Sequence, residues 1–139
     1  MKAKKLLTNF AFAIIAIVVF SGCAKDDFDP IEFVCPQVIS TDPVNGATSV
    51  VLNKIITATF NEVMDASTIT STSFIVNLGT TTVAGTISYA GTTATFTPAS
   101  PLAPNTVYTG RITTAAMDVS GNALQQDYVW SFRPVLFLL

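Results

Sequence analysis

The chain has 139 residues and a formal net charge of −2, with 12% charged and 50% hydrophobic residues. This length allows one small domain behind an N-terminal targeting segment, and the apolar composition excludes a disordered chain. The low charge content excludes a nucleic-acid binder that depends on phosphate contacts. The sequence has no histidine, which removes the commonest general base, Ser-His and Cys-His nucleophiles, and histidine zinc ligands. We therefore expect no enzyme, no cofactor and no metal site.

Residues 1–22 have the parts of a secretory signal peptide. Lys2, Lys4 and Lys5 form a basic start, and Phe10 to Phe20 is an unbroken apolar run. Such a run has the length of a signal-peptide core. It is shorter than the about 20 residues that a membrane-spanning helix needs. We therefore predict an exported protein rather than one that spans a membrane.

The apolar run ends in Ser21-Gly22-Cys23, two small residues before a cysteine. This N-terminus resembles a bacterial lipoprotein signal, and the resemblance implies cleavage before Cys23 and lipidation of Cys23. Each buried CH₂ of a lipid contributes about 0.8 kcal/mol, so several chains on one residue make a stable anchor. The membrane is then a partner through the lipid anchor. The alternative is an ordinary signal peptide followed by an incidental cysteine.

Residues 23–35 are predicted to be the lipidated cysteine and an acidic tether. Lys25 is followed by Asp26, Asp27 and Asp29, a stretch that resembles the export tag of lipoproteins on the outer face of some Gram-negative outer membranes. It predicts an outer membrane lipoprotein at the cell surface. The alternative is a solvated linker on a periplasm-facing lipoprotein. A lipidated Cys23 would leave the other cysteine without a partner in the chain, so we expect no disulfide.

Residues 36–133 have the sequence pattern of a β-sandwich. Short runs of Thr, Val, Ile, Phe and Tyr alternate with polar residues and are separated by Gly, Pro and Asn turns. The segment has close to the about 100 residues of an immunoglobulin-type sandwich. The alternation predicts seven strands, near residues 37–41, 54–60, 73–78, 83–89, 94–98, 107–113 and 127–133, and a short extra strand near 50–52.

Each predicted strand has one apolar side, which we expect to face the core. The inward residues are Ile56, Ala58, Phe60, Phe74, Val76, Leu78, Val83, Ile87, Tyr89, Ala94, Phe96, Tyr108, Ile112, Tyr128, Trp130 and Phe132. The threonines between them are expected to face solvent, where threonine is a common strand residue. An array of threonines that binds ice or glycan is the alternative, which the lack of a strict repeat disfavours.

Five motifs in order resemble the SbsA-type bacterial Ig-like domain. They are VISTDPVNGA at 38–47, ITATFNEVMD at 56–65, LAPNTVY at 102–108, DVSGN at 118–122 and WSF at 130–132. The resemblance implies an Ig-like antiparallel β-sandwich that acts as a non-catalytic surface stalk or adhesion module, with a cell-surface protein or a glycan as ligand. It brings no catalytic residues with it. The alternative is the anchor-proximal fragment of a larger surface protein, such as a hydrolase, ice-binding protein or adhesin.

Three further positions suggest chemistry but favour structural roles. Glu62 and Asp65 follow a strand at the spacing of an acid–base or calcium pair, yet Asp65 before Ala-Ser-Thr predicts an N-cap and Met64 a core residue. Asp118 and its neighbours offer oxygen ligands, but their pattern favours an Asx-type turn. Tyr108 after Leu102 resembles a tyrosine corner, and a ring that stacks on a ligand is the alternative.

Residues 134–139 form an apolar tail behind the predicted domain. Pro134 has no N–H and is expected to end the last strand. The five apolar residues that follow are unusual at the exposed end of an exported domain. We expect them to lie outside the evolved domain and to reflect truncation or a reading-frame change in a longer parent. The alternative is that they fold back over the open end of the sandwich.

Overall fold

The computed structural model describes residues 35–137 of the chain. The predicted signal peptide at 1–22, the lipidation site Cys23 and nearly all of the tether lie outside the described residues, so those expectations stay predictions. Within the described part, no helix is long and apolar enough to cross a membrane.

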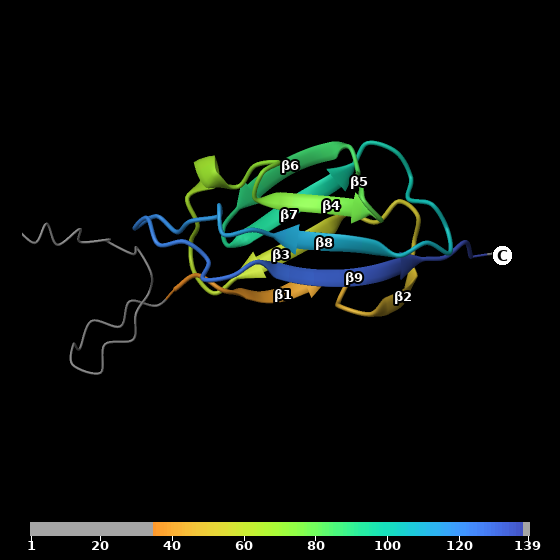
Figure 1. Cartoon of the computed structure of the whole chain (residues 1–139), viewed down its shortest axis with the longest axis horizontal. Helices are drawn as coiled ribbons and strands as arrows, with labels where there is room; N and C mark the ends of the chain where they lie inside the picture. Colours follow the sequence, from red (N-terminus) through yellow and green to blue (C-terminus); the bar gives the residue numbers. More distant parts are fainter. Residues whose placement is uncertain (1–34, 138–139) are drawn as a thin grey trace, which may run out of the picture.

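The described chain folds into two sheets that pack face to face (Figure 1). Sheet A has the strand order β1-β3-β7-β6, and sheet B has the order β2-β9-β8-β4-β5. A single turn of 3-10 helix, η1, lies between β3 and β4. The elements are β1 (Val38–Asp42), β2 (Ala47–Val50), β3 (Ile56–Phe60), η1 (Ala66–Thr68), β4 (Phe74–Leu78), β5 (Thr81–Thr82), β6 (Gly85–Ala90), β7 (Thr93–Pro98), β8 (Tyr108–Ile112) and β9 (Tyr128–Pro134).

The predicted all-β sandwich is confirmed, and each of the seven predicted strands is present. The short extra strand expected near 50–52 lies earlier in the chain, as β2 at Ala47–Val50. Its position is set by its pairing with β9, to which it runs parallel. The prediction of a purely antiparallel sandwich is wrong for this one pair. The two-residue strand β5 was not predicted, because two threonines carry no alternation.

Large side chains from both sheets fill the space between them. Trp130, Phe60, Phe74 and Phe132 are the largest fully buried side chains. The rings of Trp130 and Phe74 are 6.0 Å apart between centroids. Gly110 lies opposite Trp130 in the β8–β9 register, and a Cβ at this glycine would overlap the indole ring. All predicted inward residues are buried in this core or packed against it.

Loop residues close the two ends of the core. Met64 is buried as predicted, and Ile69, Leu102, Ala116 and Leu124 join it from segments that the alternating pattern does not cover. These residues lie between strands, where no period of two exists to mark them. The core therefore includes loop side chains that strand patterns alone do not reveal.

The last strand ends at Pro134, as predicted. Pro134 is buried, and its carbonyl accepts a 2.7 Å hydrogen bond from the backbone N–H of Asn105. The N–H of Val135 donates to the carbonyl of Val50 at 2.9 Å. Of the five apolar residues expected to lie outside the domain, Val135 is therefore bonded to the sandwich. Leu136 and Phe137 are 58% and 55% exposed, and the origin of the tail stays a prediction.

Candidate functional site

Two loops that carry the predicted carboxylates meet at one pole of the sandwich, where the described chain begins (Figure 1). Met64 and Asp118 form an isolated antiparallel bridge. The N–H of Asp65 donates to the carbonyl of Met117 at 2.8 Å, and the N–H of Val119 donates to that of Val63 at 3.4 Å. These contacts fasten the β3–η1 loop to the β8–β9 loop.

Asp118 is the centre of the β8–β9 loop. Its Oδ1 accepts hydrogen bonds from the N–H groups of Ser120 and Asn122, both at 2.8 Å, and its Oδ2 accepts one from Asn122 Nδ2 at 2.8 Å. Burial works to raise the pKa of Asp118, but the hydrogen bonds from Asn122, Ser120 and Gly121 outweigh it and lower the pKa. The predicted Asx-type turn is confirmed.

Glu62 lies beside Asp118 rather than acting with Asp65. Burial raises the pKa of Glu62, and the negative charge of Asp118 and a hydrogen bond to it raise the pKa further. Glu62 Oε1 is buried and has no hydrogen-bond donor beside it among the described residues. Because the pKa of Glu62 is raised and that of Asp118 is lowered, Glu62 is the partner that takes up a proton first as the pH falls.

Asp65 caps η1, as predicted. Its Oδ1 accepts hydrogen bonds from the N–H of Ser67 at 2.9 Å and from its hydroxyl at 2.7 Å. These bonds lower the pKa of Asp65. The structure therefore separates the two carboxylates that the sequence places together. No group of three or more His, Cys, Asp or Glu side chains in the described residues could hold a metal ion.

Tyr108, the first residue of β8, forms the predicted tyrosine corner. Its hydroxyl accepts a 2.8 Å hydrogen bond from the N–H of Ala103. Its ring stacks on Phe132 with 5.8 Å between centroids and 11° between planes. Ring and hydroxyl are both engaged inside the fold, so Tyr108 is a structural residue rather than a ligand platform.

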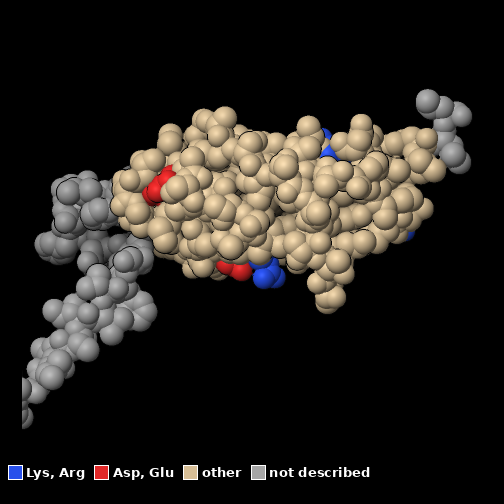
Figure 2. Space-filling view, turned by 90° about the horizontal axis from the view of Figure 1, so that it is seen from above, with Lys and Arg blue, Asp and Glu red and all other residues tan. Residues whose placement is uncertain are grey.

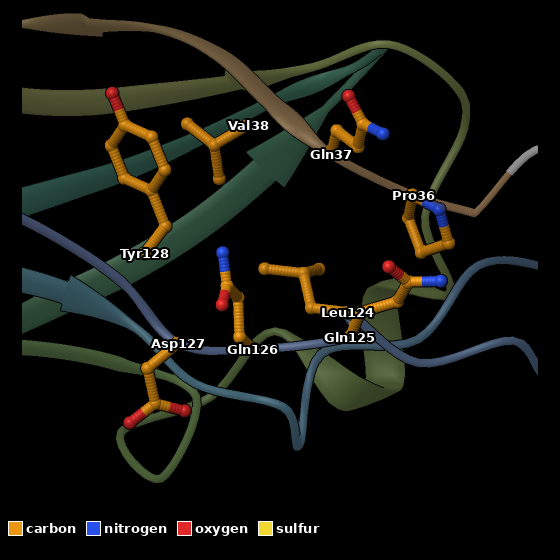
Figure 3. A pocket seen from close by; sticks show the side chains of 8 residues that line it. All are labelled: Pro36, Gln37, Val38, Leu124, Gln125, Gln126, Asp127 and Tyr128. Atoms are coloured by element: carbon orange, nitrogen blue, oxygen red, sulfur yellow. The ribbon is translucent and has the colours of Figure 1, made fainter. Parts of the chain in front are cut away.

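A pocket of about 330 Å³ lies near the same pole as the two loops. It lies between the start of β1 and the segment that leads into β9. Its lining residues are Pro36, Gln37, Val38, Leu124, Gln125, Gln126, Asp127 and Tyr128. Figure 3 shows Leu124 and Gln126 pointing into the space between the two segments, while Asp127 points away. Sequence analysis missed this pocket because its two walls are far apart in the chain and neither contains a motif.

Cys35 stands just before this pocket and takes part in a disulfide. Gln125 Nε2 donates to its Sγ at 3.2 Å, and its carbonyl accepts from Asn61 Nδ2 at 3.3 Å. The expectation of a chain without a disulfide is therefore wrong for this structure. The other cysteine of the chain, Cys23, lies outside the described residues.

The surface of the described domain carries few charges (Figure 2). Two ion pairs join Lys54 to Asp42 at 2.6 Å and Arg111 to Asp127 at 3.7 Å. Threonines cover the outer side of sheet A, as expected, and the hydroxyls of Thr59 and Thr93 lie 3.2 Å apart. The charged residues between 35 and 137 are Asp42, Lys54, Glu62, Asp65, Arg111, Asp118, Asp127 and Arg133.

Comparison with sequence families gives one match to most of the chain. A family model described as "Bacterial Ig-like domain" matches residues 34–133. This range covers every strand of the sandwich except the last residue of β9. No curated protein sequence matches the chain.

Solved structures share the sandwich at low sequence identity. The S-layer protein rSbsC(31-844) matches with a TM-score of 0.56 and 19% identity, over 76% of this chain and 14% of that protein. CopC from Methylosinus trichosporium OB3b gives 0.57 and 13%, over 75% of this chain and 99% of CopC. The L,D-transpeptidase LdtMt1, solved in complex with imipenem, gives 0.53 and 17%, over 73% and 41%. At these identities the likeness concerns the fold alone, and the chain spans 14% of the length of the SbsC structure.

Proposed function

Since the chain belongs to the bacterial Ig-like domain family, we propose that it is a non-catalytic module of the bacterial cell surface, anchored to a membrane by lipid on Cys23. The sandwich serves as a stalk or as an adhesion domain that binds a cell-surface protein or a glycan. The anchor places it on the outer membrane, with the acidic tether directing it to the outer face. A periplasm-facing lipoprotein is the alternative location.

The placement of the two ends of the described chain supports this proposal. The described part of the chain begins at Cys35, beside the β3–η1 and β8–β9 loops, and leaves β9 at the opposite pole (Figure 1). In a module with its ends at opposite poles, the chain enters at one end of the sandwich and leaves at the other, so the whole length of the sandwich lies between a membrane anchor and its far end. This geometry suits a stalk, because the domain adds its full length to the distance from the membrane.

The internal use of polar groups also supports a module without catalysis. The carboxylate oxygens of Asp65 and Asp118 accept capping and turn hydrogen bonds, and the hydroxyl of Tyr108 accepts one from a backbone N–H. General acid–base work needs a titrating group within hydrogen-bond reach of a substrate. A standalone enzyme is therefore not the function that we propose.

A second candidate is the anchor-proximal part of a larger surface protein. The exposure of Leu136 and Phe137 at the pole opposite Cys35 favours it, since large apolar side chains are unusual on an exposed end of a domain. The SbsC structure, of which this chain spans 14%, is a longer protein with a similar sandwich. Sequencing the gene beyond the codon for Leu139 distinguishes the two candidates, because a coding sequence for further domains there would favour the larger parent.

Metabolic labelling with an alkyne fatty acid tests the anchor. The two cysteines provide a matched pair of variants, Cys23→Ala and Cys35→Ala. We expect label on the wild type and on Cys35→Ala, and none on Cys23→Ala. Label that survives Cys23→Ala would contradict the proposed anchor.

A further inference from the structure

Sheet A ends in β6, and one edge of this strand has no partner strand in the described chain. β6 pairs with β7 in an unbroken register from Gly85↔Pro98 to Ala90↔Thr93. The strand has six residues and contains neither a charged residue nor a proline. An edge of this kind offers a row of unpaired N–H and C=O groups to another strand.

The other three sheet edges carry features that discourage pairing. β5 has two residues, and β2 has four with a register shift in its pairing to β9. β1 has a register shift between Val38 and Ser40 and carries the charge of Asp42. Short strands, bulges and edge charges are the usual protection against further pairing. Only β6, among the edges of the described sheets, lacks all of them.

The free backbone groups of β6 can be assigned from its hydrogen bonding. The N–H of Ala99 donates to the carbonyl of Ala84 at 2.9 Å, directly before the strand. In an antiparallel ladder every second residue bonds to the same neighbour, so Ala84 and alternate residues after it face β7. The N–H and C=O groups of Gly85, Ile87 and Tyr89 therefore point to the open edge.

We propose that β6 pairs antiparallel with β6 of a second copy of this chain, which joins two A sheets into one sheet of eight strands. The two-fold axis passes through Ile87, so that Ile87 faces Ile87 of the second copy. Gly85 then faces Tyr89 of the second copy, and Thr86 faces Ser88. All three residues with free backbone groups enter the new ladder.

This register follows from the strand itself. A shift by one residue would set inward side chains of one copy against outward side chains of the other. A shift by two residues would set Gly85 against Gly91, which has a φ of 62° in the hairpin turn and lies outside the strand. The register through Ile87 therefore pairs residues 85–89 of each strand with one another and keeps inward side chains opposite inward ones.

The side chains fit the same pairing. An aromatic residue on the neighbouring strand that covers a strand glycine stabilises sheets. Phe96 of β7 covers Gly85 within the chain, because a Cβ at Gly85 would lie 2.5 Å from Phe96 Cζ. Tyr89 is held against its own chain, because its hydroxyl accepts a 2.7 Å hydrogen bond from the N–H of Met64. Neither inward side chain therefore needs to move when the edge of β6 is paired.

The charge pattern favours a second copy as the partner. β6 and its neighbour β7 contain no charged residue, so two copies can meet at this edge without like-charge repulsion. An acidic chain would otherwise repel its own copy. The inference does not depend on the lipid anchor, and it adds a partner that the proposed function leaves unnamed.

A charge-exchange series on the full chain, extracted from membranes in detergent, tests the pairing. Thr86 and Ser88 are exposed and face outward, so charged replacements are compatible with the fold. We expect T86K/S88K and T86E/S88E each to be monomeric, because like charges stand opposite one another. An equimolar mixture of the two should form mixed dimers, which requires both variants to be folded.

The variant T86K/S88E tests the register. With the axis at Ile87, position 86 of one copy faces position 88 of the other, so opposite charges meet in this variant and it should remain dimeric like the wild type. I39K/S40K is the control, with two lysines at exposed positions of β1, the opposite edge strand of sheet A, and it should also stay dimeric. Native mass spectrometry or light scattering reads the mass of each sample. A monomeric wild type, or a T86K/S88K variant as dimeric as the wild type, would overturn the inference.

Discussion

Trp130 is one of the inward residues in the alternating sequence of β9, and its side chain packs between the two sheets. It is 1% exposed, and it stands on Gly110 of β8 and against Phe74 of β4. Its Nε1 is buried without a hydrogen-bond partner in the described structure. The indole therefore contributes through its apolar area and contacts, while its N–H carries a desolvation penalty.

Replacement of Trp130 should measure this contribution. Trp130→Ala should lower the free energy of unfolding by about 3–5 kcal/mol, a large part of the about 5–15 kcal/mol of a typical domain. Trp130→Phe should lose less, because it also removes the unpaired N–H. Val129→Ala, at a half-exposed neighbour, is the control and should change stability by about 0.5 kcal/mol or less. A urea midpoint for Trp130→Ala equal to the wild type would mean that the strand faces are inverted.

The Glu62–Asp118 pair predicts a pH dependence of stability with a definite sign. The pKa of Glu62 is raised above its ordinary value of 4.5. Between pH 4.5 and the raised pKa, the folded protein keeps a proton that the unfolded chain loses, so stability falls as pH rises through this range. Asp118, with its pKa lowered from 3.8, stabilises the fold above pH 3.8 and loses this effect as pH falls further.

Glu62→Gln should remove the Glu62 effect alone. A glutamine amide donates to Asp118 without any proton to lose, so the variant should be more stable than the wild type at neutral pH. It should also show a smaller decline of stability as the pH rises from about 4.5 to 7. Urea unfolding across this range supplies the measurement. A variant with the same decline as the wild type would show that Glu62 does not keep a proton in the fold.

Local roles of single residues could be predicted, and pairings between distant residues could not. The N-cap at Asp65 and the turn at Asp118 depend on neighbours within four residues, which the sequence displays directly. The contact of Glu62 with Asp118 depends on how two loops meet. The same reason hides the pocket between the start of β1 and the segment before β9.

At the scale of elements, the alternation of apolar and polar residues is sufficient to predict a strand wherever that strand buries one face. β3 and β7 show this pattern clearly, with buried and partly exposed residues in succession. It was insufficient for β2 and β5, whose existence depends on a neighbour rather than on their own sequence. Leu102 and Leu124 were missed for a related reason, because they are core residues in loops.

The end of β9 offers a prediction about the tail. Deletion of 136–139 should leave the melting temperature within about a degree of the wild type, since Leu136 and Phe137 are exposed. Deletion of 135–139 should cost about 0.5–1.5 kcal/mol more, because it removes the hydrogen bond from Val135 to Val50. Thermal unfolding of the two deletions compares them directly. A large loss in the shorter deletion would identify the whole tail as a packed element.

At the scale of the whole molecule, the fold is compatible with several functions and does not identify one of them. A similar sandwich occurs in an S-layer protein, in CopC and in an L,D-transpeptidase, and a shared fold does not imply a shared activity. The features of this chain that bear on its function are a described sandwich with its ends at opposite poles, few surface charges, and an N-terminus that we propose to be lipidated. The central claim therefore depends on what happens at Cys23.

Mass spectrometry of the tryptic N-terminal peptide of the membrane-extracted protein tests that claim most directly. Trypsin cuts after Lys25, so the account predicts a lipopeptide that begins at Cys23, ends at Lys25 and carries a diacylglycerol thioether, with residues 1–22 absent. Cleavage at another position, or an unmodified Cys23 in the mature protein, would contradict the account.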